Sequence, residues 1–117
     1  MSSSESSVFS KIIARAIPAT IVAEDDRVIA IEDIAPKAPV HVLVIPKTEQ
    51  YRDVTELAAG DPSLLAEMVA LAKSLATEHA DGEYRLIFNN GASAAQSVFH
   101  VHAHVLASIE ENKLVGF

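Results

Sequence analysis

The sequence contains no cysteine and no tryptophan, and aromatic residues make up only 5% of the chain. The absence of cysteine excludes disulfide bonds, thiolate metal sites and a cysteine nucleophile. A chain without thiols is compatible with a reducing compartment, and we expect a cytoplasmic protein.

Basic residues are also scarce. Nine Lys and Arg stand against 16 Asp and Glu, the net charge is −7, and no basic cluster is present. Nucleic acid and anionic membranes are therefore not expected partners. The longest apolar run, "VLVIP", is far shorter than the roughly 20 residues that span a bilayer. The first residues, "MSSSESS", lack the basic and apolar regions of a signal peptide.

The 117 residues are enough for one domain with its own core. The serine-rich start predicts a disordered tail over residues 1–7, followed by a single domain over 8–117.

Hydrophobic patterning predicts an α+β fold built on an antiparallel sheet. A short helix follows residue 7 and ends before Pro18, with Ser7 or Ser10 as its cap. A longer helix begins at Asp61-Pro62 and ends near Gly82, after a helical turn at residues 54–57. Strands are expected at residues 20–23, 28–31, 40–45, 84–90 and 98–107, with 20–31 forming a hairpin and 40–45 a buried central strand.

The stretch "FHVHAHVL" contains three histidines in strict alternation. On a strand, His100, His102 and His104 point to one face, about 6.6 Å apart from two rises of about 3.3 Å each. Two chemistries need such a row. A metal ion is one, with His41 as a fourth nitrogen. A nucleophilic imidazole is the other, with one ring nitrogen held as a donor and flanking imidazoles supporting a phosphoryl group.

The adjoining loop "NNGASAAQS" favours the second chemistry. Its small residues expose backbone N–H groups that suit an anion, and Asn89, Gln96 and Ser97 add polar side chains. The sequence therefore predicts a phosphate site beside the histidines.

The stretch "QSVFHVHAHVL" resembles the signature of the histidine triad superfamily. The stretches "FSKIIARAIPATIVAEDDRVIAIEDIAPKAPVHVLVIPK" and "YRLIFNNGASAAQSV" are similar to the Hint branch, the purine-nucleoside phosphoramidases. The resemblance implies a five-stranded antiparallel sheet with two helices, and a homodimer whose sheets join into ten strands. It also implies hydrolysis of nucleoside 5′-phosphoramidates through a nucleotidyl-histidine, with an AMP-like purine nucleotide as ligand and no cofactor.

The resemblance also implies roles for individual residues. His102 is the nucleophile, His100 and His104 flank it, and His41 in "PVHVLVIP" completes the network. Ser97 serves the leaving group, Asn89 and Gln96 lie on the phosphate side, and Asp33 holds the ribose hydroxyls. An apolar base pocket is formed by Phe9, Ile12, Ile31 and Ile34.

Several positions depart from the pattern of the superfamily. Ser7, Ser10 and Glu49 stand where many relatives have zinc ligands, so we expect no metal site. Ile31 replaces a common aromatic residue, which weakens stacking on the base. Ala94-Ala95 replaces a glycine pair, and the ending "ASIEENKLVGF" lacks the usual glycine-rich tail.

Two alternative functions stay open. Some members of the superfamily cleave dinucleoside polyphosphates, whose leaving group is already acidic. The transferase branch replaces the third histidine with glutamine, and His104 argues against that branch. The second alternative is a nucleotide-binding dimeric interaction protein without physiological turnover.

Overall fold

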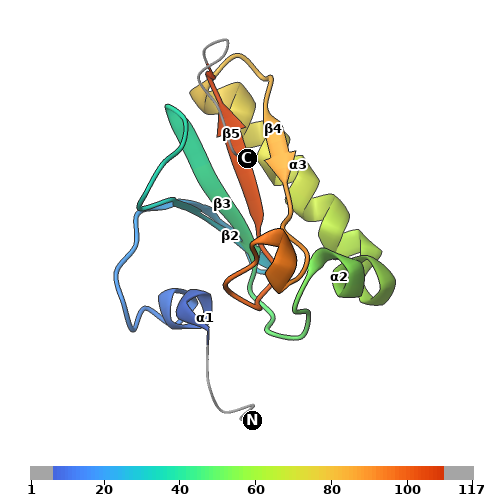
Figure 1. Cartoon of the computed structure of the whole chain (residues 1–117). Coiled ribbons are helices and arrows are strands. Elements are labelled where there is room, and N and C mark those ends of the chain that lie inside the picture. Colours follow the sequence, from blue (N-terminus) through green and yellow to red (C-terminus); the bar gives the residue numbers. More distant parts are fainter. Residues whose placement is uncertain (1–6, 110–117) are drawn as a thin grey trace.

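The computed structural model describes residues 7–109, which form a five-stranded antiparallel sheet with helices on both faces (Figure 1). The predicted α+β class is therefore confirmed. The strand order is β1-β2-β3-β5-β4, so the predicted central strand is central. In chain order the elements are α1 (Val8–Ile13), β1 (Ile21–Glu24), β2 (Val28–Glu32), β3 (Val40–Pro46), α2 (Val54–Gly60), α3 (Pro62–His79), β4 (Arg85–Ile87), a 3-10 turn (Ala92–Ala94) and β5 (Ala103–Ala107).

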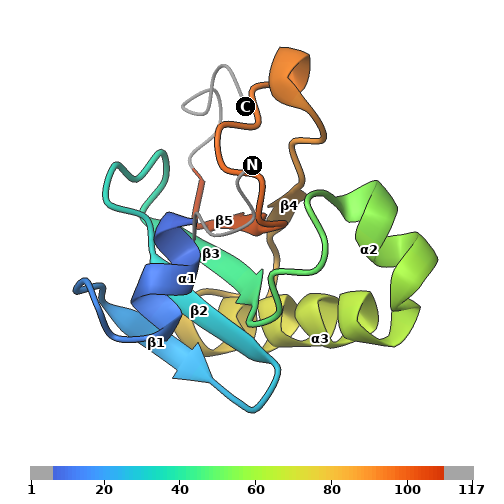
Figure 2. The same ribbon diagram turned by 90° about the horizontal axis from the view of Figure 1, so that it is seen from below.

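Strand alternation divides the apolar residues between two faces of the sheet. Val28, Val42 and Val105 pack with the buried stripe of α3 in the larger core. Ile29 and Leu43, their sequence neighbours, belong to a smaller cluster with the apolar residues of α1. Figure 2 shows α1 and α3 on opposite sides of the sheet. The sheet thus has one face covered by α3, and an opposite face on which the described residues contribute the six-residue helix α1 and loop residues such as Ile17 and Val98.

Side-chain caps explain where the helices begin. Ser7 accepts a hydrogen bond from the N–H of Ser10 and is the N-cap of α1, as predicted. The expected tail over residues 1–7 otherwise lies outside the described residues. Asp53 and Asp61 cap α2 and α3 in the same way. The expected helical turn at 54–57 is a helix in its own right, so the described residues contain three α-helices and not two.

Two helix ends differ from the predictions. Helix α1 stops at Ile13, well before Pro18, because Arg15 turns into the left-handed region at φ 64°. Helix α3 stops at His79, before the expected Gly82, which follows the C-cap Ala80 with φ 91°. The N–H of Gly82 still donates to the carbonyl of Ala76, so it closes the last turn as glycine commonly does.

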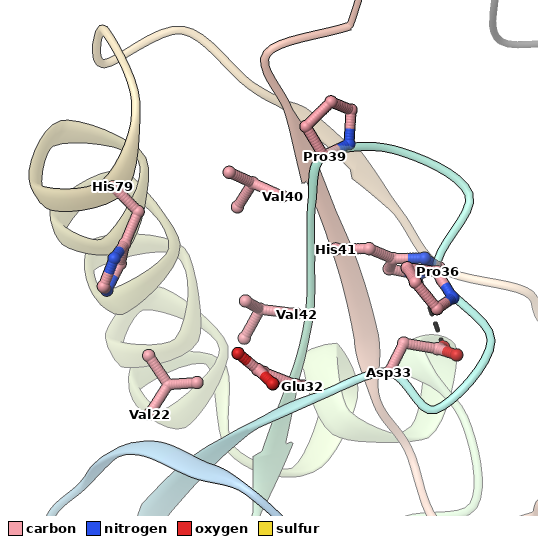
Figure 3. A pocket seen from close by; sticks show the side chains of 9 residues that line it. All are labelled: Val22, Glu32, Asp33, Pro36, Pro39, Val40, His41, Val42 and His79. Atoms are coloured by element: carbon pink, nitrogen blue, oxygen red, sulfur yellow. Dashed lines mark ion pairs between the residues drawn. The ribbon is translucent and has the colours of Figure 1, made fainter.

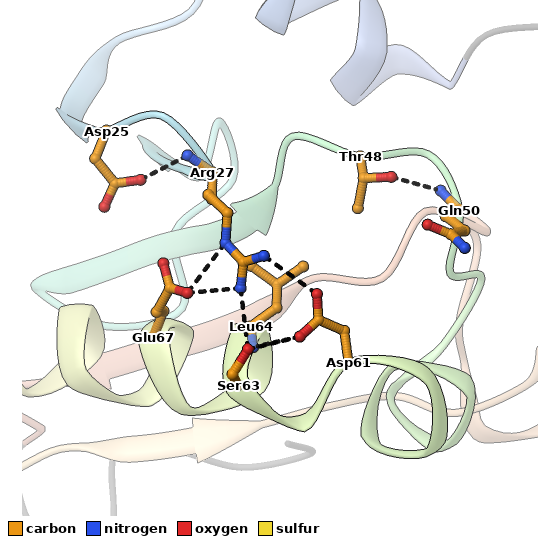
Figure 4. A network of polar contacts seen from close by, with 8 residues as sticks. All are labelled: Asp25, Arg27, Thr48, Gln50, Asp61, Ser63, Leu64 and Glu67. Atoms are coloured by element: carbon orange, nitrogen blue, oxygen red, sulfur yellow. Dashed lines mark hydrogen bonds and ion pairs between the residues drawn. The ribbon is translucent and has the colours of Figure 1, made fainter.

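Arg27 ties the β1–β2 turn to the start of α3 (Figure 4). Its guanidinium lies 3.2 Å from Asp61 Oδ2 and 2.6 Å from Glu67 Oε2. These ion pairs hold the start of α3 against the β1–β2 turn, at the end of the helix opposite His79. Within residues 7–109, no helix combines the length and the apolar composition that crossing a membrane requires.

Candidate active site

Four histidines gather on the α1 face of the sheet. His41 comes from β3 and His104 from β5, which are paired neighbours. Along the chain, Val101, Ala103 and Val105 alternate with the triad histidines and pack into the larger core. The ring centroids of His41 and His104 lie 5.2 Å apart, and those of His104 and His102 lie 5.4 Å apart. The predicted cluster of imidazoles is therefore formed.

The strand predicted over residues 98–107 is too long. Only Ala103–Ala107 forms β5, so His104 alone of the triad lies on a strand. The segment before β5 bonds to a loop and not to a neighbouring strand. The Val101 N–H donates to the carbonyl of Tyr51, and the Gln96 amide donates to the carbonyl of Val98. A carbonyl of a distant loop and a local side-chain bond therefore stand in place of the ladder that local patterning suggested.

The His102 ring is oriented by the backbone of the same segment. Its Nδ1 lies 2.9 Å from the carbonyl oxygen of His100. A carbonyl oxygen only accepts hydrogen bonds, so His102 carries its proton on Nδ1 in the neutral form. The lone pair is then left on Nε2. Phe9 packs edge-on against this ring, with centroids 4.8 Å apart.

His100 is the most buried of the four histidines, at 2% exposure. Its Nε2 lies 2.7 Å from the carbonyl oxygen of Pro46, and its Nδ1 lies 2.8 Å from Ser7 Oγ. The carbonyl requires the proton on Nε2, so Nδ1 accepts from the Ser7 hydroxyl. Both ring nitrogens of His100 are thus occupied by protein groups. The N-cap residue of α1 and the last residue of β3 together hold it.

His41 and His104 form a hydrogen-bonded pair beside Asp33. The Lys37 N–H donates to His41 Nδ1 at 2.9 Å, so His41 carries its proton on Nε2. That nitrogen lies 3.0 Å from His104 Nδ1 and 3.4 Å from Asp33 Oδ2. Figure 3 shows the His41 and Asp33 side chains directed toward each other. His104 therefore accepts at Nδ1 and carries its own proton on Nε2.

The same three side chains have the spacing of a metal site. Asp33, His41 and His104 each offer one donor atom, and the three atoms lie within 4.8 Å of one another. A metal on His41 Nε2 would move the ring proton to Nδ1, where it would face the N–H of Lys37. The donor set fits a chain of hydrogen bonds better than it fits a cation. The expected absence of a metal stays a prediction.

Burial lowers the pKa of all four histidines below its ordinary value. Loss of hydration is the largest cause in each case, because it penalises the charged ring. The pKa of His104 falls furthest, to about 4, since the neighbouring His102 and His41 add to the burial. The negative charge of Asp33 raises the pKa of His41, His102 and His104 and so offsets part of the effect of burial. At neutral pH the site is a cluster of neutral imidazoles.

The loop between β4 and the triad is held by its own amides. Gln96 is 5% exposed, and its Nε2 donates to the carbonyls of Arg52 and Val98 while its Oε1 accepts from the Gly91 N–H. Asn89 donates to the carbonyl of Ala94. The sequence predicted that both amides lie on the phosphate side of the site. In this structure they form hydrogen bonds with backbone groups instead. Ser97, between Gln96 and the triad, is exposed.

Three of the four residues expected to form a base pocket are together. Phe9, Ile12 and Ile31 belong to the smaller core cluster and are nearly buried. Ile34 stands apart in the loop after β2 and is fully exposed. A hollow of about 320 Å³ lies on the opposite side of β3, toward the end of α3. It is lined by Val22, Glu32, Asp33, Pro36, Pro39, Val40, His41, Val42 and His79 (Figure 3).

Two contacts that orient the histidines were not anticipated from the sequence. The Lys37 N–H is a backbone group, and nothing in residue type marks it as the partner of His41. Ser7 was expected to be a helix cap, and its bond to His100 joins residues 93 positions apart. A cap serine whose hydroxyl also donates to a residue distant in sequence cannot be recognised without the tertiary structure.

Comparison with known proteins accounts for nearly the whole chain. A family model described as "Scavenger mRNA decapping enzyme C-term binding" matches residues 6–115. An uncharacterized HIT-like protein of Synechocystis sp. is 46% identical over 106 residues, covering 87% of this chain and 90% of that protein. A 14 kDa zinc-binding protein of Zea mays is 40% identical over 110 residues, covering 90% of this chain and 84% of that protein.

The fold is shared with solved structures at high sequence identity. A HIT family hydrolase from Clostridium thermocellum superposes with a TM-score of 0.84 at 45% identity, covering 92% of this chain and 94% of that one. The abbreviation HIT denotes the histidine triad, the motif that places His100, His102 and His104 in this site. On its sequence, its fold and its triad, the chain belongs to the histidine triad superfamily.

Proposed function

We propose that the protein hydrolyses nucleoside 5′-phosphoramidates through a covalent nucleotidyl-histidine at His102. The observation that carries this proposal is the 2.9 Å contact between His102 Nδ1 and the carbonyl oxygen of His100. It fixes the proton on Nδ1 and leaves the lone pair on Nε2, as a nitrogen nucleophile requires. The lowered pKa of His102, caused by burial, keeps that lone pair available at neutral pH.

The reaction has two steps that balance. His102 Nε2 attacks the phosphorus, the phosphorus–nitrogen bond breaks, and the amine leaves with a proton taken from solvent. Water then attacks the phosphorus, the bond to Nε2 breaks, and the nucleoside monophosphate is released together with the proton that this water gives up to solvent. His104 carries its proton on Nε2 because Nδ1 accepts from His41, so it offers a donor to a phosphoryl oxygen.

Further roles follow from the resemblance to the Hint branch. Ser97 serves the leaving amine, and Asp33 holds the ribose hydroxyls with its carboxylate. Phe9, Ile12 and Ile31, which cluster together, contact a purine base, and Asn89 and Gln96 act on the phosphate side. For the two amides, the contacts seen here support an indirect role. They shape the loop whose backbone N–H groups would face the anion.

Relatives with solved structures support a hydrolytic role on nucleotides. The Clostridium thermocellum and Legionella pneumophila relatives are both described as HIT family hydrolases. A Sulfolobus tokodaii relative is described as a histidine triad nucleotide-binding protein. The proposal adds the bond that is cleaved and the residue that carries the nucleotide.

The direct test is to trap the intermediate. The protein is mixed with adenosine 5′-phosphoramidate, quenched in denaturant, and digested for mass mapping of adenylylated histidine. We expect the adduct on His102, and we expect H102A to lose turnover while it still binds AMP. The matched control is H79A, which removes an exposed histidine outside the cluster and should leave turnover unchanged. An adduct at another residue, or turnover retained in H102A, contradicts the proposed mechanism.

A second measurement separates the proposal from its alternatives. Turnover of diadenosine triphosphate is compared with turnover of adenosine phosphoramidate at equal concentrations. A strong preference for the polyphosphate would assign the protein to dinucleoside polyphosphate hydrolysis. Tight AMP binding without turnover of either substrate would assign it to nucleotide-dependent interaction.

A homodimer is part of this proposal. Strand β4 is the last strand of the sheet, and among residues 7–109 only β5 pairs with it. A second copy added along that edge would extend five strands to ten. Light scattering on purified protein tests this, and a monomer at the concentration of the activity assay would contradict it.

A further inference from the structure

The position of the nucleophilic ring depends on His100. The carbonyl oxygen of His100 accepts from His102 Nδ1 at 2.9 Å, so any rotation of the His100 backbone moves the His102 ring. The His100 side chain prevents that rotation from inside the protein. It is 2% exposed, and its Nε2 is bound to the carbonyl oxygen of Pro46 at 2.7 Å.

The second anchor of His100 is a single hydroxyl. Ser7 Oγ accepts from the Ser10 N–H at 3.0 Å, so its proton is available for another acceptor. His100 Nδ1 lies 2.8 Å away, closer than Ser10 Oγ at 3.3 Å. Ser10 Oγ is itself 3.4 Å from His100 Nδ1, too long for an equivalent bond. Ser7 is therefore the donor that stabilises the Nε2–H tautomer of His100.

From these contacts we propose that Ser7 is a positioning residue that orients the His102 nucleophile through His100. The relay runs from the Ser7 hydroxyl to His100 Nδ1, and from the His100 carbonyl to His102 Nδ1. It gives the N-cap of α1 a catalytic consequence beyond starting the helix. The link to catalysis rests on the proposed function, whereas the link to the ring tautomers does not.

The same helix brings an apolar contact to both rings. Phe9 is the second residue of α1, and its ring contacts His100 and His102 with centroids 5.9 Å and 4.8 Å away. Phe9 is also one of the residues expected to contact the base. Displacement of α1 would therefore loosen the His100 anchor and the packing of the nucleophile at the same time.

The test separates the hydroxyl from the helix cap. Glycine is a mild replacement for serine at an N-cap, so S7G removes the donor and keeps most of the cap. We expect kcat for adenosine phosphoramidate to fall about tenfold in S7G, in line with the loss of a hydrogen bond that orients a functional imidazole. KM should change much less, because no substrate contact is removed. The conservative variant S7T keeps the hydroxyl and should restore most of kcat.

A readout that does not need turnover distinguishes the relay from the proposed function. Two-bond 15N–1H correlation spectra report which nitrogen of each imidazole carries the proton. We expect wild type to show His100 protonated on Nε2 and His102 on Nδ1, and S7G to shift both toward tautomer mixtures. D53G, which alters the N-cap of α2, is the matched control and should leave both rings unchanged.

The outcomes decide the two proposals separately. Unchanged tautomers in S7G, or unchanged kcat in an active protein, overturn the positioning role of Ser7. Absence of turnover in wild type overturns the proposed function, and the tautomer shift then still decides the relay. Equal losses in S7G and D53G would show that general loosening, and not the hydroxyl, is responsible, and would also overturn the role of Ser7.

Discussion

Mild acid should destabilise the fold through its buried histidines before it reaches most carboxylates. The folded state holds His104 with a pKa of about 4, against an ordinary value of 6.5. Below pH 6.5 His104 therefore becomes protonated in the unfolded chain while it stays neutral in the folded chain, and the free energy of unfolding falls as the pH falls. At pH 5, one and a half units below the ordinary value, the loss from His104 alone is about 2 kcal/mol at about 1.4 kcal/mol per unit. The lowered pKa values of His41, His100 and His102 act in the same direction.

Urea unfolding followed by circular dichroism at pH 7.5, 6.5, 5.5 and 5.0 measures this loss. H104Q keeps a polar side chain of similar length and removes the titrating group, so its stability should depend less steeply on pH across the same window. Lowered carboxylate pKa values, such as those of Asp25 and Asp61, act below this window because their ordinary value is 3.8. A wild-type free energy of unfolding that is flat from pH 7.5 to 5.0 would refute the reasoning.

Three further substitutions test the loop beside the triad and the ion-pair network of Arg27. Q96L removes a buried amide that serves three backbone groups and should cost about 2 kcal/mol in urea unfolding; a neutral result would show that water replaces those bonds. G91A places a side chain at φ 102°, a region of backbone strain that costs about 1–3 kcal/mol, and thermal melting should register it, whereas an unchanged melting temperature would mean that the loop relaxes. R27M breaks the half-exposed ion pairs to α3 and should lower the free energy of unfolding slightly at low salt and less at high salt; a loss insensitive to salt would assign the effect to packing.

The sequence alone determined the features that depend on neighbours along the chain. Alternating side chains set the faces of the strands, so that Val42 and Val105 enter one core while Ile29 and Leu43 enter the other. Polar cap residues, whose side chains accept from a backbone N–H three residues further on, marked where helices α1 and α3 begin. The triad spacing was sufficient to indicate imidazole chemistry, since three alternating residues share a face whatever the rest of the fold does.

Only the tertiary structure decided which hydrogen-bond partners the imidazoles have and therefore which tautomers they adopt. The proton position of His100 follows from the Pro46 carbonyl and the Ser7 hydroxyl, and that of His104 from His41, all of them groups far away in sequence that folding brings together. The start of β5 at Ala103 and the isolation of Ile34 likewise could not be predicted from local sequence. Periodicity fixes which way a side chain points, because adjacent dihedral angles are coupled. The partner that it meets depends on contacts between distant segments, such as the 93-residue separation from Ser7 to His100, and those contacts set the tautomers.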